Sequence, residues 1–136
     1  MSDLFVDTSA YSALLRGDER VRDALRSART IRVNPVVLGE LLAGFLRGRH
    51  RRKNEAELGR FLASPRVALV PIDGGTAERY ALLVNSLRRR GKPIPTNNLW
   101  IAASAAQHGL RLLTLDAHFL AVDQVLVDYL ETNAGD

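Results

Sequence analysis

The chain has 136 residues and a mass of 15.0 kDa, which suits one domain over residues 1–136. Its 46% hydrophobic and 25% charged residues are ordinary globular usage and argue against disorder or low-complexity repeats. The sequence contains 0 Cys, which excludes disulfides, a thiol nucleophile and metals bound by thiolates. The 3 His are too widely spaced to favour a histidine-rich zinc site, so binding of a hard cation by carboxylates stays open.

The net charge of the chain is positive, with 19 basic against 15 acidic residues and a pI of about 10.1, which favours polyanionic partners. Only Lys53 and Lys92 are lysines, so almost all of this charge is guanidinium, which binds phosphate with two parallel hydrogen bonds. A GC-rich genome would produce the same bias and remains an alternative explanation. Because the sequence offers neither a membrane-length apolar stretch nor a signal peptide, we expect a cytoplasmic protein with no membrane partner.

Short apolar runs alternate with helical periodicity along the whole chain. In the first half, the predicted elements are a strand at 4–6, a helix at 10–15, a helix at 18–29 capped by Asp18, a strand at 31–33, a helix at 35–45 with Pro35 in its first turn, and a polar helix opened by the charged run 47–53. In the second half, they are a strand at 67–70, a long helix capped by Thr76, a proline-rich loop at 92–97, a small-residue helix at 99–106, a strand at 112–115, a turn or helix through Phe119, and a weak strand at 125–127. This order predicts a three-layer α/β/α fold with a central parallel sheet.

Acidic residues follow two of the most apolar predicted strands. Asp7 and Asp116 come at the carboxyl ends of these strands, where open parallel sheets bind ligands, and Glu40 lies on or beside an apolar helix face. Carboxylates buried together need a cation or an arginine partner, and Mg²⁺ or Mn²⁺ fits an all-oxygen site. Simpler roles remain open: Asp7 as a helix cap, Glu40 as a satisfied core acid and Asp116 as a turn residue.

Four segments, which together span nearly the whole chain, share their order and spacing with a known family. They are the strand ending in Asp7-Thr8-Ser9, then Gly39-Glu40-Leu41, then residues 93–103, and finally residues 114–119. In these segments the chain resembles the PIN-domain ribonucleases, most closely the VapC toxins of bacterial toxin–antitoxin pairs. The resemblance implies a PIN-like fold and a Mg²⁺- or Mn²⁺-dependent endoribonuclease that inhibits translation and growth, in which Asp7, Glu40 and Asp116 help to hold the metal. Whether Glu40 binds metal, holds a water or acts as general base stays open.

The sequence departs from the family pattern at Asn98. The family usually has an aspartate there, two residues before the stretch that begins at Trp100, and we count position 98 among the catalytic and metal-binding positions. An amide keeps the shape and one acceptor oxygen but loses the charge, so metal binding and activity are expected to be impaired. Two explanations compete, a natural divergent member and a deliberate substitution that protects an expression host, and the otherwise complete motif favours the second. The alternative function is a catalytically silent module that binds RNA or an antitoxin.

The resemblance also implies partners. These are an RNA substrate, a VapB-type antitoxin whose tail covers the active groove, and operator DNA bound only through that antitoxin. A homodimer is expected, which forms a hetero-oligomer with the antitoxin. The RNA phosphates are expected to contact basic residues beside the loop that leads to position 98, namely Arg88, Arg89, Arg90 and Lys92. The charged run 47–53 is a second candidate for this contact, a solvated face, or an antitoxin contact.

Several other side chains accompany these acids. Thr8, Ser9 and Thr114 either order the waters and carboxylates of the site or, for Thr8 and Ser9, only start a helix. Trp100 is expected to pack in the core rather than to stack on a base. Of the two late histidines, His118 is expected nearer to the site than His108.

Overall fold

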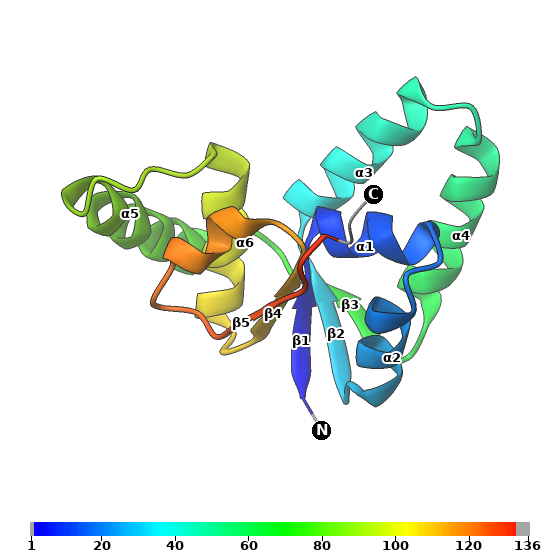
Figure 1. Cartoon of the computed structure of the whole chain (residues 1–136), viewed down its shortest axis with the longest axis horizontal. Helices are drawn as coiled ribbons and strands as arrows, with labels where there is room; N and C mark the ends of the chain where they lie inside the picture. The colour runs from blue at the N-terminus through cyan, green and yellow to red at the C-terminus, as the bar shows by residue number, and fades with distance from the viewer. Residues whose placement is uncertain (1, 133–136) are drawn as a thin grey trace.

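The computed structural model describes residues 2–132, and the strands in this range form one parallel sheet (Figure 1). Its five strands run in the order β3-β2-β1-β4-β5. Their bounds are Asp3–Val6 for β1, Thr30–Val33 for β2, Val67–Leu69 for β3, Arg111–Thr114 for β4 and Val127–Tyr129 for β5. Leu4 pairs with Ile31 on one side and with Arg111 on the other, which places β1 at the centre of the sheet. The predicted central parallel sheet is therefore confirmed.

Helices cover both faces of the sheet and complete the three layers. Within residues 2–132 they are α1 Thr8–Leu15, α2 Glu19–Ser27, α3 Pro35–Arg47, α4 Arg51–Ala63, α5 Gly74–Arg89, α6 Thr96–Gln107 and the 3-10 helix η1 Ala117–Ala121. Helices α1 to α4 lie on one face, and α5, α6 and η1 lie on the other (Figure 1). None of these helices combines the length and the apolar character that crossing a bilayer requires.

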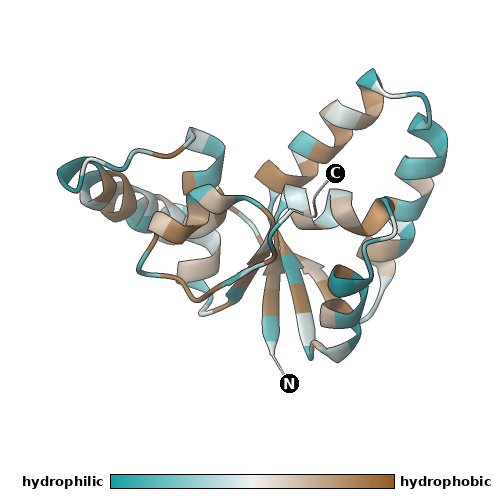
Figure 2. Ribbon diagram, viewed as in Figure 1, coloured by the Kyte–Doolittle hydropathy of each residue, from teal (hydrophilic) through white to brown (hydrophobic). Residues whose placement is uncertain are grey.

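The core lies where the two central strands meet the helices. Phe5, Val6, Leu112 and Leu113 on β1 and β4 are at most 2% exposed. Figure 2 shows hydrophobic residues on the strands and on the helices that cover them, whereas the outer helix α4 is mostly hydrophilic. Burial on both faces explains why these strands read as continuous apolar runs rather than as alternating ones.

Two helix starts differ from the sequence prediction. Asp73, not Thr76, is the N-cap of α5, and the two residues form a capping box in which each side chain accepts a hydrogen bond from the backbone N–H of the other, at 3.2 and 3.0 Å. The intervening glycines have low helix propensity, which hides this start from sequence reasoning. Helix α6 begins at Thr96 rather than at Leu99, so Asn98 belongs to its first turn.

Two other boundaries shift by a few residues. The charged run 47–53 spans the end of α3, a turn and the start of α4, because α3 continues to Arg47 and α4 starts only at Arg51. The last strand lies at Val127–Tyr129 rather than at 125–127, where it pairs with β4. Neither shift changes the order of elements or the topology.

Asn34 joins α3 to α6 across the sheet edge. This side chain is 0% exposed, and its Oδ1 accepts a hydrogen bond from the backbone N–H of Val37 at 3.1 Å, which caps α3. Its Nδ2 donates to the Ser104 hydroxyl at 2.8 Å and to the Trp100 carbonyl at 3.3 Å, both on α6. One buried amide thus fixes the relative position of the two helices that carry Glu40 and Asn98.

Replacing Asn34 by alanine is expected to lower the free energy of unfolding by about 2–4 kcal/mol, because it removes a helix cap and leaves buried groups of α6 without partners. Equilibrium urea unfolding measures this loss. Asn85→Ala, an exposed position on α5, is the matched control and is expected to change stability by less than about 0.5 kcal/mol. If both variants lose the same free energy of unfolding, the hydrogen bonds of Asn34 do not stabilise the packing of α3 on α6.

Candidate active site

The sheet changes direction between β1 and β4, and the predicted acids lie at that point. From β1 the chain proceeds outward through β2 to β3, and then returns to the other side of β1 for β4 and β5. Connections that diverge in this way leave a crevice beyond the carboxyl ends of the two strands. Asp7 directly follows β1, and Asp116 lies two residues beyond the end of β4. The topology therefore brings both residues to one crevice.

Asp7 is buried and held by neutral donors. The side chain is 2% exposed, its Oδ1 accepts from the backbone N–H of Ala10 and from the Ser9 hydroxyl, both at 2.8 Å, and its Oδ2 accepts from the Thr114 hydroxyl at 2.5 Å. Asp7 is thus the N-cap of α1, as the simpler interpretation held, and also part of the crevice. Burial raises the pKa of Asp7 to about 6 against the opposing effect of these hydrogen bonds, and the nearby charge of Asp116 adds to the rise.

Asp116 shares Thr114 with Asp7. The Thr114 hydroxyl accepts from the backbone N–H of Asp116 at 2.9 Å, and Asn98 Nδ2 donates to Asp116 Oδ2 at 3.0 Å. The other carboxylate oxygen lies 2.8 Å from His118 Nδ1 and accepts from the His118 backbone N–H at 2.9 Å. Burial raises the pKa of Asp116, but the bonds from the His118 backbone and from Asn98 outweigh it, so the pKa lies below its usual value.

His118 therefore lies at the crevice, as predicted. His108 instead lines a pocket with Asp3 and Thr30, which begin β1 and β2, so it lies at the opposite edge of the sheet. His108 is the C-cap of α6, which is a structural role.

Glu40 lies on α3 and is linked to the other predicted positions through their chain neighbours. The Thr8 hydroxyl donates to Glu40 Oε1 at 2.5 Å, and Asn97 Nδ2 donates to Oε2 at 3.2 Å. Thr8 follows Asp7 in the chain and Asn97 precedes Asn98, so both partners connect Glu40 to the other predicted positions. Thr8 starts α1 and also orients Glu40, which combines the two roles left open by the sequence. Sequence reasoning assigned no role to Asn97, although Asn97 lies inside the segment that carries the family resemblance.

The three predicted acids carry the type of oxygen donor that a hard divalent cation prefers, but the structure does not gather all three into one metal-binding group. Asp7, Glu40 and Asp116 offer carboxylate oxygens, and within residues 2–132 no Lys or Arg forms an ion pair with any of them. In the same range, no three acidic or histidine side chains stand as a group that could hold a metal. Asn98 accounts for part of this arrangement, because its amide donates to Asp116 where a further carboxylate would repel it. The oxygens suit Mg²⁺ or Mn²⁺, and the charge at position 98 is missing.

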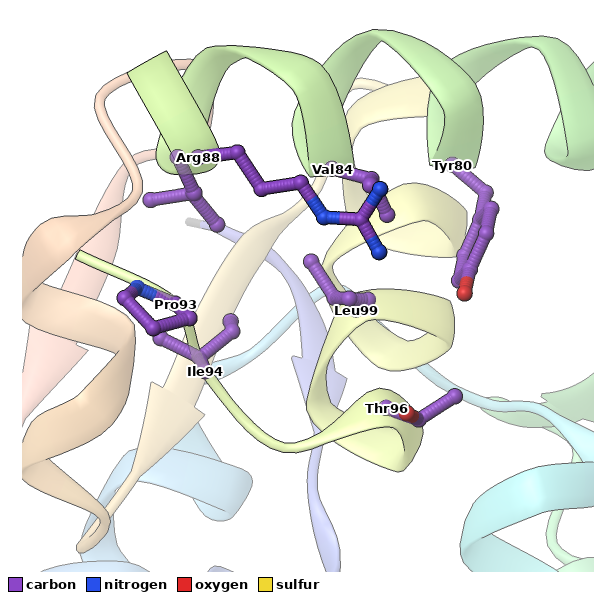
Figure 3. A pocket seen from close by; sticks show the side chains of 8 residues that line it. Tyr80, Val84, Arg88, Pro93, Ile94, Thr96 and Leu99 are labelled. Atoms are coloured by element: carbon purple, nitrogen blue, oxygen red, sulfur yellow. The ribbon is translucent and has the colours of Figure 1, made fainter. Parts of the chain in front are cut away.

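The basic residues predicted to contact RNA lie at the end of α5 and in the loop after it. Arg90 is occupied, since its guanidinium donates to the Ala121 carbonyl at 2.5 Å and to Asp123 at 3.1 Å and so attaches α5 to η1 and the turn after it. Arg89 and Lys92 are exposed. Arg88 extends over a pocket lined by Tyr80, Pro93 and Leu99 (Figure 3). Because Asn98 faces Asp116 whereas Leu99 lines this pocket, Arg88 lies on another side of α6 from the acids.

Trp100 packs against α5 but is half-buried and lies outside the hydrophobic core, so the predicted core position is wrong. Its ring stacks on Tyr80 with the centroids 4.1 Å apart and an interplanar angle of 17°. This contact supports the extensive packing of α6 on α5 and places the indole among structural contacts.

Sequence reasoning missed Arg16, the C-cap of α1. Arg16 lines a groove that contains Asp116 and a second groove that contains Glu40. No motif marks this residue, because only the placement of α1 across the sheet edge brings it beside the acids.

Replacing Asp7 by asparagine is expected to stabilise the protein above about pH 6. The native pKa of about 6 exceeds the unfolded value of about 4, so the parent loses stability as the pH rises between them, by about 3 kcal/mol in total. The variant avoids this loss, and its advantage in free energy of unfolding vanishes near pH 4. Thermal unfolding across this range measures the effect, with Asp23→Asn, exposed on α2, as the control. An advantage that does not depend on pH would contradict the raised pKa.

The chain matches known proteins over nearly its full length. The family model described as PIN domain matches residues 4–125. Ribonuclease VapC4 of Mycobacterium tuberculosis is 36% identical over 95 residues, which cover 70% of this chain and 73% of the relative.

Two solved structures show the same architecture. VapBC-5 of Mycobacterium tuberculosis, a member of the VapBC family of toxin–antitoxin systems, superposes with a TM-score of 0.74 at 28% identity and covers 97% of this chain and 100% of that one. VapBC2 of Rickettsia felis, bound to a DNA fragment from its promoter, gives a TM-score of 0.80 at 21% identity, over 93% of this chain and 97% of that one, and supports the fold alone. With the predicted fold present and the matches covering most of its length, the chain belongs to the PIN-domain family and, within it, to the VapC ribonuclease toxins.

Proposed function

We propose that this chain is the endoribonuclease toxin of a toxin–antitoxin pair, that it hydrolyses RNA phosphodiesters with the help of Mg²⁺ or Mn²⁺, and that residues 1–136 form a single PIN domain. The observation that carries this proposal is the buried Asp7 carboxylate, linked through Thr114 to Asp116 in the crevice between β1 and β4. Such a carboxylate has neutral partners only, and a bound cation would offset the free-energy cost of ionising it.

The three acids share one role in the proposed reaction, and neighbouring side chains orient two of them. Asp7, Glu40 and Asp116 would hold the metal, which when bound activates a water and stabilises the charge that develops on the phosphate. Ser9 and Thr114 orient Asp7, while His118 orients Asp116.

Glu40 is also the candidate to hold the attacking water or to accept its proton as general base. Its Oε1 takes part in the short bond from Thr8, whereas Oε2 has a single partner, the Asn97 amide at 3.2 Å. Oε2 is therefore the freer oxygen for this role.

Asn98 is proposed to impair activity. Its amide donates to Asp116, so the local charge is satisfied by a hydrogen bond instead of a cation. An aspartate at this position would face Asp116 with two carboxylates about 3 Å apart, an arrangement that needs a cation or a proton between them. Asn98 thereby stabilises the metal-free crevice and weakens its attraction for Mg²⁺.

The proposed partners follow from the relatives. Because the VapBC structures contain a toxin with its antitoxin, we infer that a VapB-type antitoxin binds this chain and that operator DNA is reached only through that antitoxin. A homodimer that assembles with the antitoxin into a hetero-oligomer, and action on cytoplasmic RNA, belong to the same proposal.

A second candidate function is a catalytically silent module that binds RNA or the antitoxin. The neutral amide of Asn98 favours it, as does the absence within residues 2–132 of three acidic or histidine side chains grouped for metal binding.

Replacing Asn98 by aspartate distinguishes the two functions. The variant is expected to bind Mg²⁺ or Mn²⁺ at least about tenfold more tightly than the parent, measured by calorimetry, because it adds a charge to the cation site. Metal-dependent cleavage of total cellular RNA, abolished by EDTA, is expected from the variant and reduced in the parent. In EDTA the variant is expected to unfold at a lower temperature than the parent, and added Mg²⁺ should restore its stability.

Asn85→Asp introduces the same chemical change at an exposed position of α5 and serves as the matched control. If the Asn98→Asp variant binds no divalent cation and cuts no RNA, the binding module is the better description. If the parent already binds metal and cleaves as well as the variant, the proposed impairment is wrong, although the nuclease function remains.

A further inference from the structure

Two grooves flank α1 and meet at Arg16. The first, which we term the Asp116 groove, has a volume of about 470 Å³ and is lined by Ser9, Ser12, Arg16, Asp116 and Tyr129, among others. The second, which we term the Glu40 groove, has a volume of about 390 Å³ and is lined by Thr8, Ser12, Arg16, Glu40, Gly44 and Arg47, among others. Because Ser12 and Arg16 line both grooves, these form one path around the edge of α1 that passes the proposed active site on both sides.

The arginines of this path have free guanidinium groups. Within residues 2–132, the side chains of Arg16 and Arg47 make no hydrogen bond or ion pair. Arg90 and Arg111, by contrast, are paired with Asp123 and Asp128. Free guanidinium groups in the grooves that contain Asp116 and Glu40 can hold an anionic ligand without first giving up a protein partner.

Gly44 brings the Arg47 side chain close to the floor of the Glu40 groove. A Cβ placed on Gly44 would lie 3.9 Å from an Arg47 guanidinium nitrogen, so the guanidinium folds back along α3 over this glycine. The absence of a side chain at position 44 keeps the Glu40 groove open beside the Arg47 guanidinium.

A nucleic acid chain that approaches three carboxylates is repelled unless cations flank them. Arg16 lies where the two grooves meet, and Arg47 lines the Glu40 groove, so the path supplies these cations on the side of the acids. The pocket beneath Arg88 is smaller, about 110 Å³, and lies on another side of α6. An extended strand therefore fits the path along α1 better than that pocket.

We propose that the Asp116 and Glu40 grooves form one binding path for single-stranded RNA, with Arg16 and Arg47 as its phosphate contacts. This inference rests on the proposed ribonuclease function. It selects Arg47 from the charged run 47–53, which the sequence offered as a candidate, and adds Arg16, which the sequence did not suggest. Arg16, at the junction, is the positioning residue that holds the strand as it passes the acids.

The experiment measures binding instead of cleavage. Fluorescence anisotropy follows a short fluorescein-labelled single-stranded RNA in EDTA, over a series of salt concentrations, with the full chain. Arg16→Ala and Arg47→Ala are each expected to weaken binding about tenfold at low salt, and to lower the slope of log affinity against log salt by about 0.7 for each lost phosphate contact. Arg26→Ala, exposed on α2 and likewise without a side-chain partner, is the matched control and is expected to bind as the parent does.

A steric pair tests the path without changing charge. Gly44→Leu is expected to fill the Glu40 groove and to weaken RNA binding, and it favours helix formation, so the fold is retained. Gly59→Leu, on α4 with nothing within 4 Å of its Cβ position, is the control. Circular dichroism and thermal unfolding check that both variants fold.

Three outcomes overturn the inference. If the parent binds RNA and the Arg16 and Arg47 variants show the same affinity and the same salt slope, the RNA path lies elsewhere. The proposed ribonuclease function would then remain intact. If the Arg16 and Arg47 variants lose affinity for a glutamate-rich peptide but keep the affinity of the parent for RNA, the arginines bind an acidic protein segment in place of RNA. Failure of the parent and of its Asn98→Asp variant both to bind and to cleave RNA would remove the proposed function and this inference together.

Discussion

The carboxylate of Asp7 is removed from water at the carboxyl end of the central strand, and its hydrogen-bond partners are neutral hydroxyl and backbone groups. Ionising it there costs free energy, which its pKa of about 6 reflects. The bonds that hold it also build the surroundings: the bond from Ala10 starts α1, and the bond from Thr114 joins the ends of β1 and β4. The crevice therefore depends on a side chain whose charge is compensated by no other residue.

A second buried polar contact places the other half of the site. Asn34 caps α3 and bonds to two groups of α6, and these helices carry Glu40 and Asn98. Because both helices are rigid elements, one contact determines how the carboxylate of Glu40 approaches the first turn of α6. Asn97, in that turn, then donates to Glu40 and completes the link.

The charges of the protein are divided between the crevice and its borders. Excess arginine gives the chain its positive balance, yet none of the arginines within residues 2–132 pairs with Asp7, Glu40 or Asp116. Some guanidinium groups serve the fold, as that of Arg90 does at Ala121, while those of Arg16 and Arg47 remain free. An acidic centre bordered by free cations suits a polyanionic ligand that is held on its backbone while a cation acts at its phosphate.

The sequence by itself determined the order of strands and helices and the three-layer α/β fold, because continuous apolar runs such as residues 112–115 identify strands buried on both faces. It also identified Asp7 and Asp116 as neighbours, since carboxyl ends of parallel strands share one edge. It missed the start of α5 at Gly74, where glycines hide a cap, and the position of Arg16 between two grooves. Only the tertiary structure decided that Asn97 holds Glu40 and that Arg16 lies beside the acids, because these contacts depend on how separate helices pack, which local spacing along the chain does not encode.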